Sequence, residues 1–217
     1  MSGVRVYNKR LLELGLTLPG FVDRSKVIAS LASLGLLTLA AHTPDNWEII
    51  YKELDNYTET EITEIINEQP NIIAFSSLTA RINETYILAE RFREQGIKVV
   101  IGGLHVSALP NEAMKFADCI IQGEGEIIWE TLLSDYENNK LKPLYSSLSN
   151  SDYTFHFNSS KVPKYELLDI SKYNRLTIQT TRGCPLHSIV CTASQTRSSY
   201  KKKPMAKIKK ELNKIFE

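Results

Sequence analysis

Short apolar runs alternate along this chain with longer segments in which apolar residues recur at helical spacing. This alternation is typical of strand–helix units that build a parallel sheet with helices on both faces. It predicts an α/β fold containing a five-stranded, doubly wound, Rossmann-like parallel sheet. The strands are expected at residues 10–16, 47–51, 71–76, 98–101 and 119–121.

The segments between these runs have the period of amphipathic helices. Asn83 is placed to cap the N-terminus of one such segment, and Gly96 to end it, since asparagine favours the N-cap and glycine the position after the last turn. Pro44 ends an earlier helix, because proline disfavours helical geometry in the residue before it. Helices are expected at residues 34–42, 59–68, 83–95, 111–117 and 126–136.

Beyond residue 137 the amino-acid composition changes: the sequence becomes rich in Ser, Asn and Asp, with scattered Tyr, Phe and Leu. These larger side chains favour a linker that docks on a surface, because disordered segments are poor in them. Residues 175–180 resume a strand, and residues 205–216 form a lysine-rich amphipathic helix. We therefore expect an α/β domain at 1–138, a linker at 139–174 and a further unit at 175–217.

Charge identifies no partner for the chain as a whole, because 26 basic residues face 25 acidic ones. The C-terminal helix is basic, which alone would suggest nucleic acid or an anionic membrane. Its apolar residues Met205, Ile208, Leu212 and Ile215 recur at helical spacing, and no aromatic platform accompanies the charge. This pattern favours a packed helix with a solvated lysine face, so no nucleic acid partner is expected.

The longest apolar stretch, residues 27–41, is interrupted by serine, glycine and threonine and is shorter than the roughly 20 residues of a membrane span. We therefore expect no membrane span. The N-terminus lacks the apolar core and cleavage site of a secretory signal. Three cysteines, an odd number, argue against a disulfide framework. A cytoplasmic protein is the expectation.

The residues that directly follow three of the predicted strands are candidates for a binding site, because ligands of doubly wound sheets lie beyond the carboxyl ends of the strands. Glycines there allow close approach to a ligand, and small hydroxyl side chains add hydrogen bonds. An isolated pair such as Gly102 and Gly103 is also explained by a tight turn alone. The candidates are Ser76, Ser77, Leu78, Gly102, Gly103, His105, Gly123, Glu124, Gly125 and Glu126.

The runs IIAFSSLT, VVIGGLHVSALPNEA and IIQGEGE together resemble the N-terminal domain of cobalamin-dependent radical S-adenosylmethionine enzymes. The resemblance implies that the serine and the glycines line the place of the corrinoid tail, and that the acidic loop closes the same end. It therefore implies a cobalamin site made of the ten candidate residues. The Asp-x-His-x-x-Gly motif of other cobalamin proteins is missing from the first loop, GLTLPGFVDRSK, so no protein imidazole is expected on cobalt.

A second resemblance lies in the run TTRGCPLHSIVCTAS, which follows the strand predicted at 175–180. It is similar to the radical S-adenosylmethionine signature, whose three cysteines hold a 4Fe-4S cluster. Cys184 and Cys191 match the first and third cysteines, whereas Ser188 stands in the middle place. A serine hydroxyl is a poor iron ligand because its pKa is far above that of a thiol. Alternative interpretations are two unrelated thiols, or a histidine ligand from His187.

Family barrels need six or more strand–helix units, and 26 residues follow Cys191. The resemblance therefore implies that residues 175–217 are an N-terminal fragment of such a domain, namely the first strand–helix unit of its barrel. For the whole chain, the resemblance implies a truncated, corrinoid-binding family member that is not independently catalytic, so no residue is assigned a catalytic role. The cluster and S-adenosylmethionine belong to the family and are not expected here. One alternative is a regulatory module that docks on a complete paralogue. Another is an enzyme split over two chains, in which a protein partner completes the barrel.

Overall fold

The computed structural model describes residues 32–54, 57–148, 155–173, 176–186, 191 and 200–216. The strand predicted at 10–16 lies outside these ranges. So do the two residues Ser188 and His187 of the cysteine motif.

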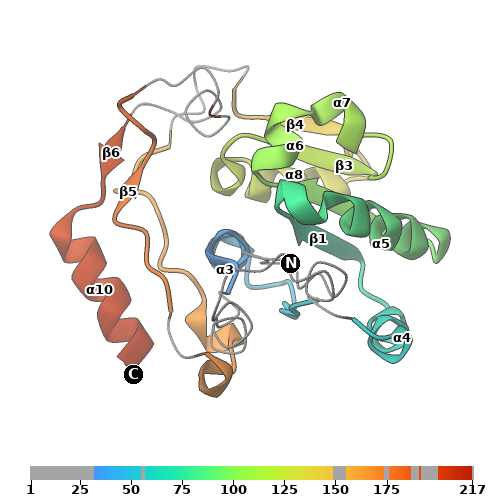
Figure 1. The fold of residues 1–217 in the computed structure, drawn as a ribbon, viewed down its shortest axis with the longest axis horizontal. Coiled ribbons are helices and arrows are strands. Elements are labelled where there is room, and N and C mark those ends of the chain that lie inside the picture. The colour runs from blue at the N-terminus through green and yellow to red at the C-terminus, as the bar shows by residue number, and fades with distance from the viewer. Residues whose placement is uncertain are drawn as a thin grey trace, which may run out of the picture.

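A parallel sheet forms the centre of the α/β part (Figure 1). Its strands follow one another across the sheet in chain order, each hydrogen-bonded to the next. The predicted parallel α/β architecture is thereby confirmed, but the described residues contribute four strands to this sheet instead of five. The strands are β1 (Ile72–Ser76), β2 (Lys98–Gly102), β3 (Cys119–Gln122) and β4 (Leu144–Ser146).

The count is four because the strand predicted at 10–16 lies outside the described ranges, whereas two further differences cancel. Residues 47–51 form no strand, although all of them except Glu48 are apolar or aromatic. Trp47 packs against the sheet core and donates its indole N–H to Glu137 at 2.9 Å. Its side chain is therefore accommodated without the backbone hydrogen bonds of a β-strand. Conversely, β4 lies inside the stretch predicted as a linker, where three residues are too short to show a period. The sheet therefore extends beyond the predicted boundary at residue 138.

The helices predicted at 34–42, 59–68 and 83–95 form within one residue of their predicted bounds. The helix predicted at 111–117 ends at Ala113, the one predicted at 126–136 begins at Trp129, and a short helix at 104–108 was not predicted. Thr58 caps α4 reciprocally with Glu61, which is the geometry of a capping box. The helix predicted from Asn83 begins one residue earlier, so Asn83 lies inside the first turn and does not cap it. Gly96 has φ +78°, which suits the predicted stop. The helices are α3 (Leu34–His42), α4 (Glu59–Asn67), α5 (Ile82–Glu94), α6 (Leu104–Ala108), α7 (Pro110–Ala113) and α8 (Trp129–Glu137).

Each face of the sheet has its own apolar core, because successive side chains of a strand point to opposite faces. Val99 and Ile101 of β2 point to the core built with α4 and α5. Val100, between them, points to the opposite core, which contains Trp129 of α8 and Leu39 of α3. Burial on both faces explains why the strands read as continuous apolar runs.

The C-terminal part contains a short antiparallel pair, β5 (Thr181–Arg182) with β6 (Lys201–Lys202), followed by α10 (Met205–Phe216). The helix has its predicted bounds, whereas the described residues of the strand predicted at 175–180 form no strand; β5 begins at Thr181. Figure 1 shows α3 between this part and the sheet. Leu37 of α3 packs there with Tyr165 and Ile215, so a third apolar core joins the two parts.

The described helices include none with both the length and the apolar character needed to cross a membrane.

Cys119 of β3 illustrates how burial controls reactivity. Its side chain is fully buried, and desolvation together with the neighbouring Asp118 carboxylate raises the pKa of the thiol to about 12. Because the thiolate is the reactive species, we expect no alkylation of Cys119 by maleimide at pH 7.5 in the folded chain. Site-resolved mass spectrometry should detect the adduct only after denaturation. Labelling of the native protein at a rate like that of exposed Cys191 would contradict this expectation.

Candidate functional site: a cavity at the strand ends

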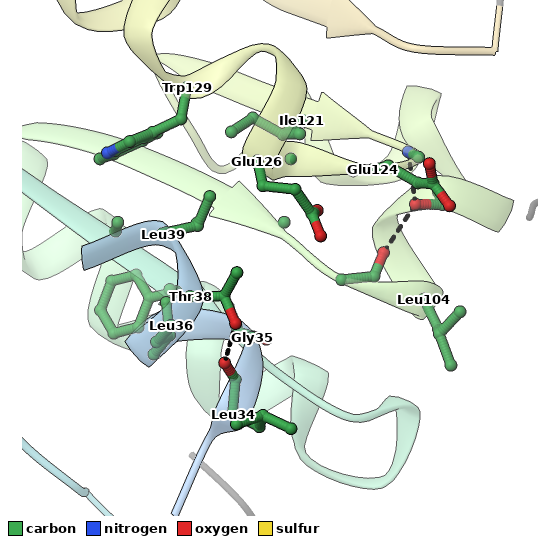
Figure 2. Close-up of a pocket in the computed structure, with 18 of the residues that line it drawn as sticks. Leu34, Gly35, Leu36, Thr38, Leu39, Leu104, Ile121, Glu124, Glu126 and Trp129 are labelled. Atoms are coloured by element: carbon green, nitrogen blue, oxygen red, sulfur yellow. Dashed lines mark hydrogen bonds between the residues drawn. The ribbon is translucent and has the colours of Figure 1, made fainter. Parts of the chain in front are cut away.

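A cavity of about 360 Å³ lies at the carboxyl ends of β1, β2 and β3, with α3 on its opposite side (Figure 2). Its volume is near the lower end of small-molecule sites, which enclose about 300 to 1,000 Å³. This is where ligands of open α/β sheets bind. The predicted residues that line it are Ser76, Ser77, Leu78, Gly102, Gly103, Gly123, Glu124, Gly125 and Glu126.

Small residues bring the strand ends close together on the sheet side of the cavity. Gly103 has φ +110°, a conformation that favours glycine. A Cβ atom at this position would also lie 3.3 Å from the carbonyl oxygen of Ser77. The pair Gly102 and Gly103 therefore turns the chain and also keeps this wall of the cavity free of side chains.

Two serines that the sequence did not single out hold the loop after β3. The Ser107 hydroxyl donates to the carbonyl of Gly103 at 2.8 Å and accepts from the backbone N–H of Gly123 at 2.9 Å. Ser147 accepts from the backbone N–H of Glu124 at 2.7 Å. These bonds tie the ends of β2, β3 and β4 to one another. Only the paired strands bring the three loops together, so no local sequence signal marked these serines.

Helix α3 supplies the apolar wall of the cavity, which sequence analysis missed. Leu34, Leu36 and Leu39 line it, and Figure 2 shows them around the space in front of the strand ends. A Cβ atom at Gly35 would meet no atom within 4 Å. The helix therefore presents a backbone surface to the cavity with open space in front of it.

The remaining wall is charged and joins both parts of the chain. Figure 2 shows Glu126 extending into the space between α3 and the strand ends, with Glu124 beside it. The guanidinium Nη1 of Arg182 in β5 lies 2.5 Å from Glu126 Oε1 and 3.8 Å from Glu124 Oε1. Gln179 also lines this wall. A site predicted from the α/β domain alone thus contains residues of the C-terminal part.

Nine of the ten candidate residues line the cavity, and His105 does not. Its ring is buried on another side of α6, with Nδ1 3.2 Å from the Thr79 hydroxyl and Nε2 3.1 Å from Glu112 Oε1. The hydrogen bonds from His105 and Tyr86 lower the pKa of the Glu112 carboxyl. The hydrogen bonds of His105 to Thr79 and Glu112 therefore hold α6 against the segments that contain these two residues.

The two cysteines of the second motif differ in exposure. Cys184 is partly buried, and its sulfur accepts a bond from the backbone N–H of Leu186 at 3.5 Å. Cys191 is exposed. Within the described ranges no three His, Cys, Asp or Glu side chains are grouped as metal ligands. Cys184 and Cys191 remain candidate iron ligands because of the motif to which they belong.

The fold and the cavity define a ligand-binding α/β domain of the Rossmann-like class. Comparison with known protein families is more specific: residues 23–133, just over half of the chain, match the B12 binding domain. The chain belongs to this family. The predicted likeness to cobalamin-binding proteins is thereby confirmed, and the matched range contains all ten candidate cobalamin residues.

Similar curated proteins carry methyltransferase names. The chain is 35% identical over 140 residues to bacteriochlorophyllide d C-8(2)-methyltransferase of Chlorobaculum tepidum, covering 60% of this chain and 30% of that protein. It is 31% identical to the C-12(1)-methyltransferase of the same organism, covering 56% and 27%. It is 24% identical to hopanoid C-2 methylase of Rhodopseudomonas palustris, covering 76% and 31%. The chain thus spans less than a third of the length of these three relatives.

Proposed function

We propose that this chain binds cobalamin with the nucleotide tail in the cavity at the strand ends, as the corrinoid-binding part of a methyltransferase-type radical S-adenosylmethionine protein. The observation that carries the proposal is the coincidence of the B12 binding domain match with a cavity whose sheet side is built from glycine and serine. Small residues leave room for a flat, bulky ligand to approach the backbone.

The residues present fit such a ligand. The open space before Gly35 and the side-chain-free wall at Gly102 and Gly103 form a cradle, and the leucines of α3 give it an apolar side. Ser76, Ser77 and Thr38 supply hydroxyl groups for the polar atoms of a tail. No histidine lines the cavity within the described part of the chain, so the proposal includes no imidazole ligand to cobalt.

Cobalamin bound in its methylated form would supply a transferable methyl group, which agrees with the methyltransferase names of the relatives. The role of this chain's own residues is to hold and orient the corrinoid. Cys184 and Cys191 would be the first and third thiolates of a 4Fe-4S cluster, but Ser188 stands in the place of the middle one. We propose on this ground that the chain does not assemble a catalytic cluster by itself. A complete partner that docks on it is the second candidate function.

Blocking the cavity tests the proposal. Gly35→Phe adds an aromatic ring at a cavity-lining position where a Cβ atom is accommodated without contact, and it should abolish retention of hydroxocobalamin. The measurement is the visible absorption of the protein after incubation with hydroxocobalamin and gel filtration. We expect about one corrinoid per chain for the unmodified protein and none for the variant.

Ile87→Phe is the matched control, because it adds a ring at an exposed helical position that does not line the cavity. It should retain hydroxocobalamin like the unmodified chain. Absence of the corrinoid band from the unmodified protein would overturn the proposal.

Anaerobic reconstitution with iron and sulfide tests the proposal that the chain assembles no catalytic cluster by itself. About four irons per chain, together with reductive cleavage of S-adenosylmethionine, would refute it.

A further inference from the structure

We propose that Arg182 is a positioning residue that couples occupancy of the corrinoid cavity to the placement of Cys184. The inference rests on the proposed function of the cavity. Arg182 belongs to the TTRGCP run and lies two residues before Cys184, yet its side chain forms part of the cavity wall. One residue therefore lines the cavity and ends the strand β5, which stops two residues before the first cysteine of the motif.

The guanidinium is held from three directions. Glu126 faces its Nη1, and its Nε and Nη2 donate to Gln179 Oε1 at 3.3 and 2.8 Å. Its carbon lies 3.6 Å from the centre of the Phe155 ring, which is a close cation–π contact. The Arg182 side chain is 11% exposed. A planar group fixed by an ion pair, two hydrogen bonds and a stacked ring has little freedom to move by itself.

The carboxylates that face Arg182 belong to the loop that closes the cavity. Glu124 and Glu126 follow β3 and are themselves almost fully buried, and both form ion pairs with the Arg182 guanidinium, which compensates part of their buried negative charge. In the described part of the chain Glu126 Oε1 accepts no hydrogen bond; its contact with Arg182 is an ion pair without hydrogen-bond geometry. A ligand that contacts the Glu126 side chain in the cavity therefore acts on a carboxylate that lies directly against Arg182.

A rigid path thus leads from the cavity to the cysteine. A ligand that contacts Glu126 fixes the carboxylate, the carboxylate fixes Arg182, and Arg182 fixes β5. Only Gly183, at φ +81°, separates β5 from Cys184. Because coupling between sites is reciprocal, a fixed β5 also favours the ligand-binding arrangement of the loop.

The rate at which N-ethylmaleimide labels Cys184, followed by site-resolved mass spectrometry with and without saturating cyanocobalamin, tests this coupling. In the unmodified chain cyanocobalamin should slow the labelling of Cys184 about 5-fold or more, the lower end of typical coupling between sites. Exposed Cys191 should keep its rate and serves as an internal control. Gel filtration in parallel measures how much cyanocobalamin each protein holds.

Arg182→Gln removes the charge and should abolish the effect of cyanocobalamin on Cys184 at equal corrinoid occupancy. Glu126→Gln, which keeps the size of the side chain, removes the other charge of the ion pair and should also abolish the effect of cyanocobalamin on Cys184. Arg182→Lys keeps the charge and should restore part of the effect. A purely structural role would raise the labelling rate in these variants but leave the response to cyanocobalamin in place.

Two outcomes overturn the inference while leaving the proposed function intact: retained cyanocobalamin without protection of Cys184 in the unmodified chain, or undiminished protection in both glutamine variants. Failure of the unmodified chain to retain cyanocobalamin overturns both, and the gel filtration step separates this case from the other two.

Discussion

Gly123→Ala is expected to lower the free energy of unfolding by about 3 kcal/mol, through backbone strain and a steric clash together. Gly123 has φ +91°, a conformation that residues with a side chain rarely adopt. The added Cβ would lie 2.2 Å from Ser147 Oγ and 3.1 Å from Leu148 Cδ2. Ser147 would have to move and give up its bond from Glu124, which opens the cavity wall. Chemical denaturation followed by circular dichroism measures the loss.

Two matched variants separate the causes. Gly96→Ala carries a similar strain at φ +78° but meets nothing within 4 Å, so it should cost only about 1 to 2 kcal/mol. In a Ser147→Ala background the clashing oxygen is absent, and Gly123→Ala should then cost little more than Gly96→Ala. Equal losses for Gly123→Ala and Gly96→Ala in the natural background would show that the contact with Ser147 is unimportant.

Lys203→Met is expected to destabilise the C-terminal part by about 3 to 5 kcal/mol, because it leaves a buried carboxylate without its counter-ion. Glu211 of α10 is almost fully buried, and its partners among the described residues are the Lys203 ammonium and the Tyr165 hydroxyl, which donates at 2.7 Å. Tyr165 belongs to the core that joins α10 to α3. Hydrogen exchange should show loss of protection in α10, and chemical denaturation should show the lower stability.

The neighbouring Lys202→Met removes an exposed charge and should change stability by less than about 0.5 kcal/mol. Replacing both members of the pair, as Lys203→Met with Glu211→Met, should recover most of the loss, since an apolar pair of similar size often substitutes for a buried ion pair. Tyr165 would still donate to the carbonyl of Thr177 at 2.9 Å. A double variant as unstable as Lys203→Met alone would contradict the electrostatic explanation.

The amino-acid sequence by itself determined the elements whose patterns are local. The period of residues 59–67 and the lysine-rich pattern of residues 205–216 each place apolar side chains on one helical face, and both helices form with nearly the predicted bounds. The loops after β1, β2 and β3 were also identifiable, because carboxyl ends of parallel strands share one edge of a sheet. For this reason nine of the ten predicted cobalamin residues line one cavity.

Only the tertiary structure decided which distant residues complete that cavity. The wall from α3, the serines 107 and 147, and Arg182 come from segments far apart in the sequence, and no local period encodes their meeting. The sheet strand at 144–146 is too short for a pattern, and the turn after Gly103 directs His105 toward Glu112 and away from the cavity. Periodicity determines which face of an element is apolar, whereas long-range packing determines what that face meets.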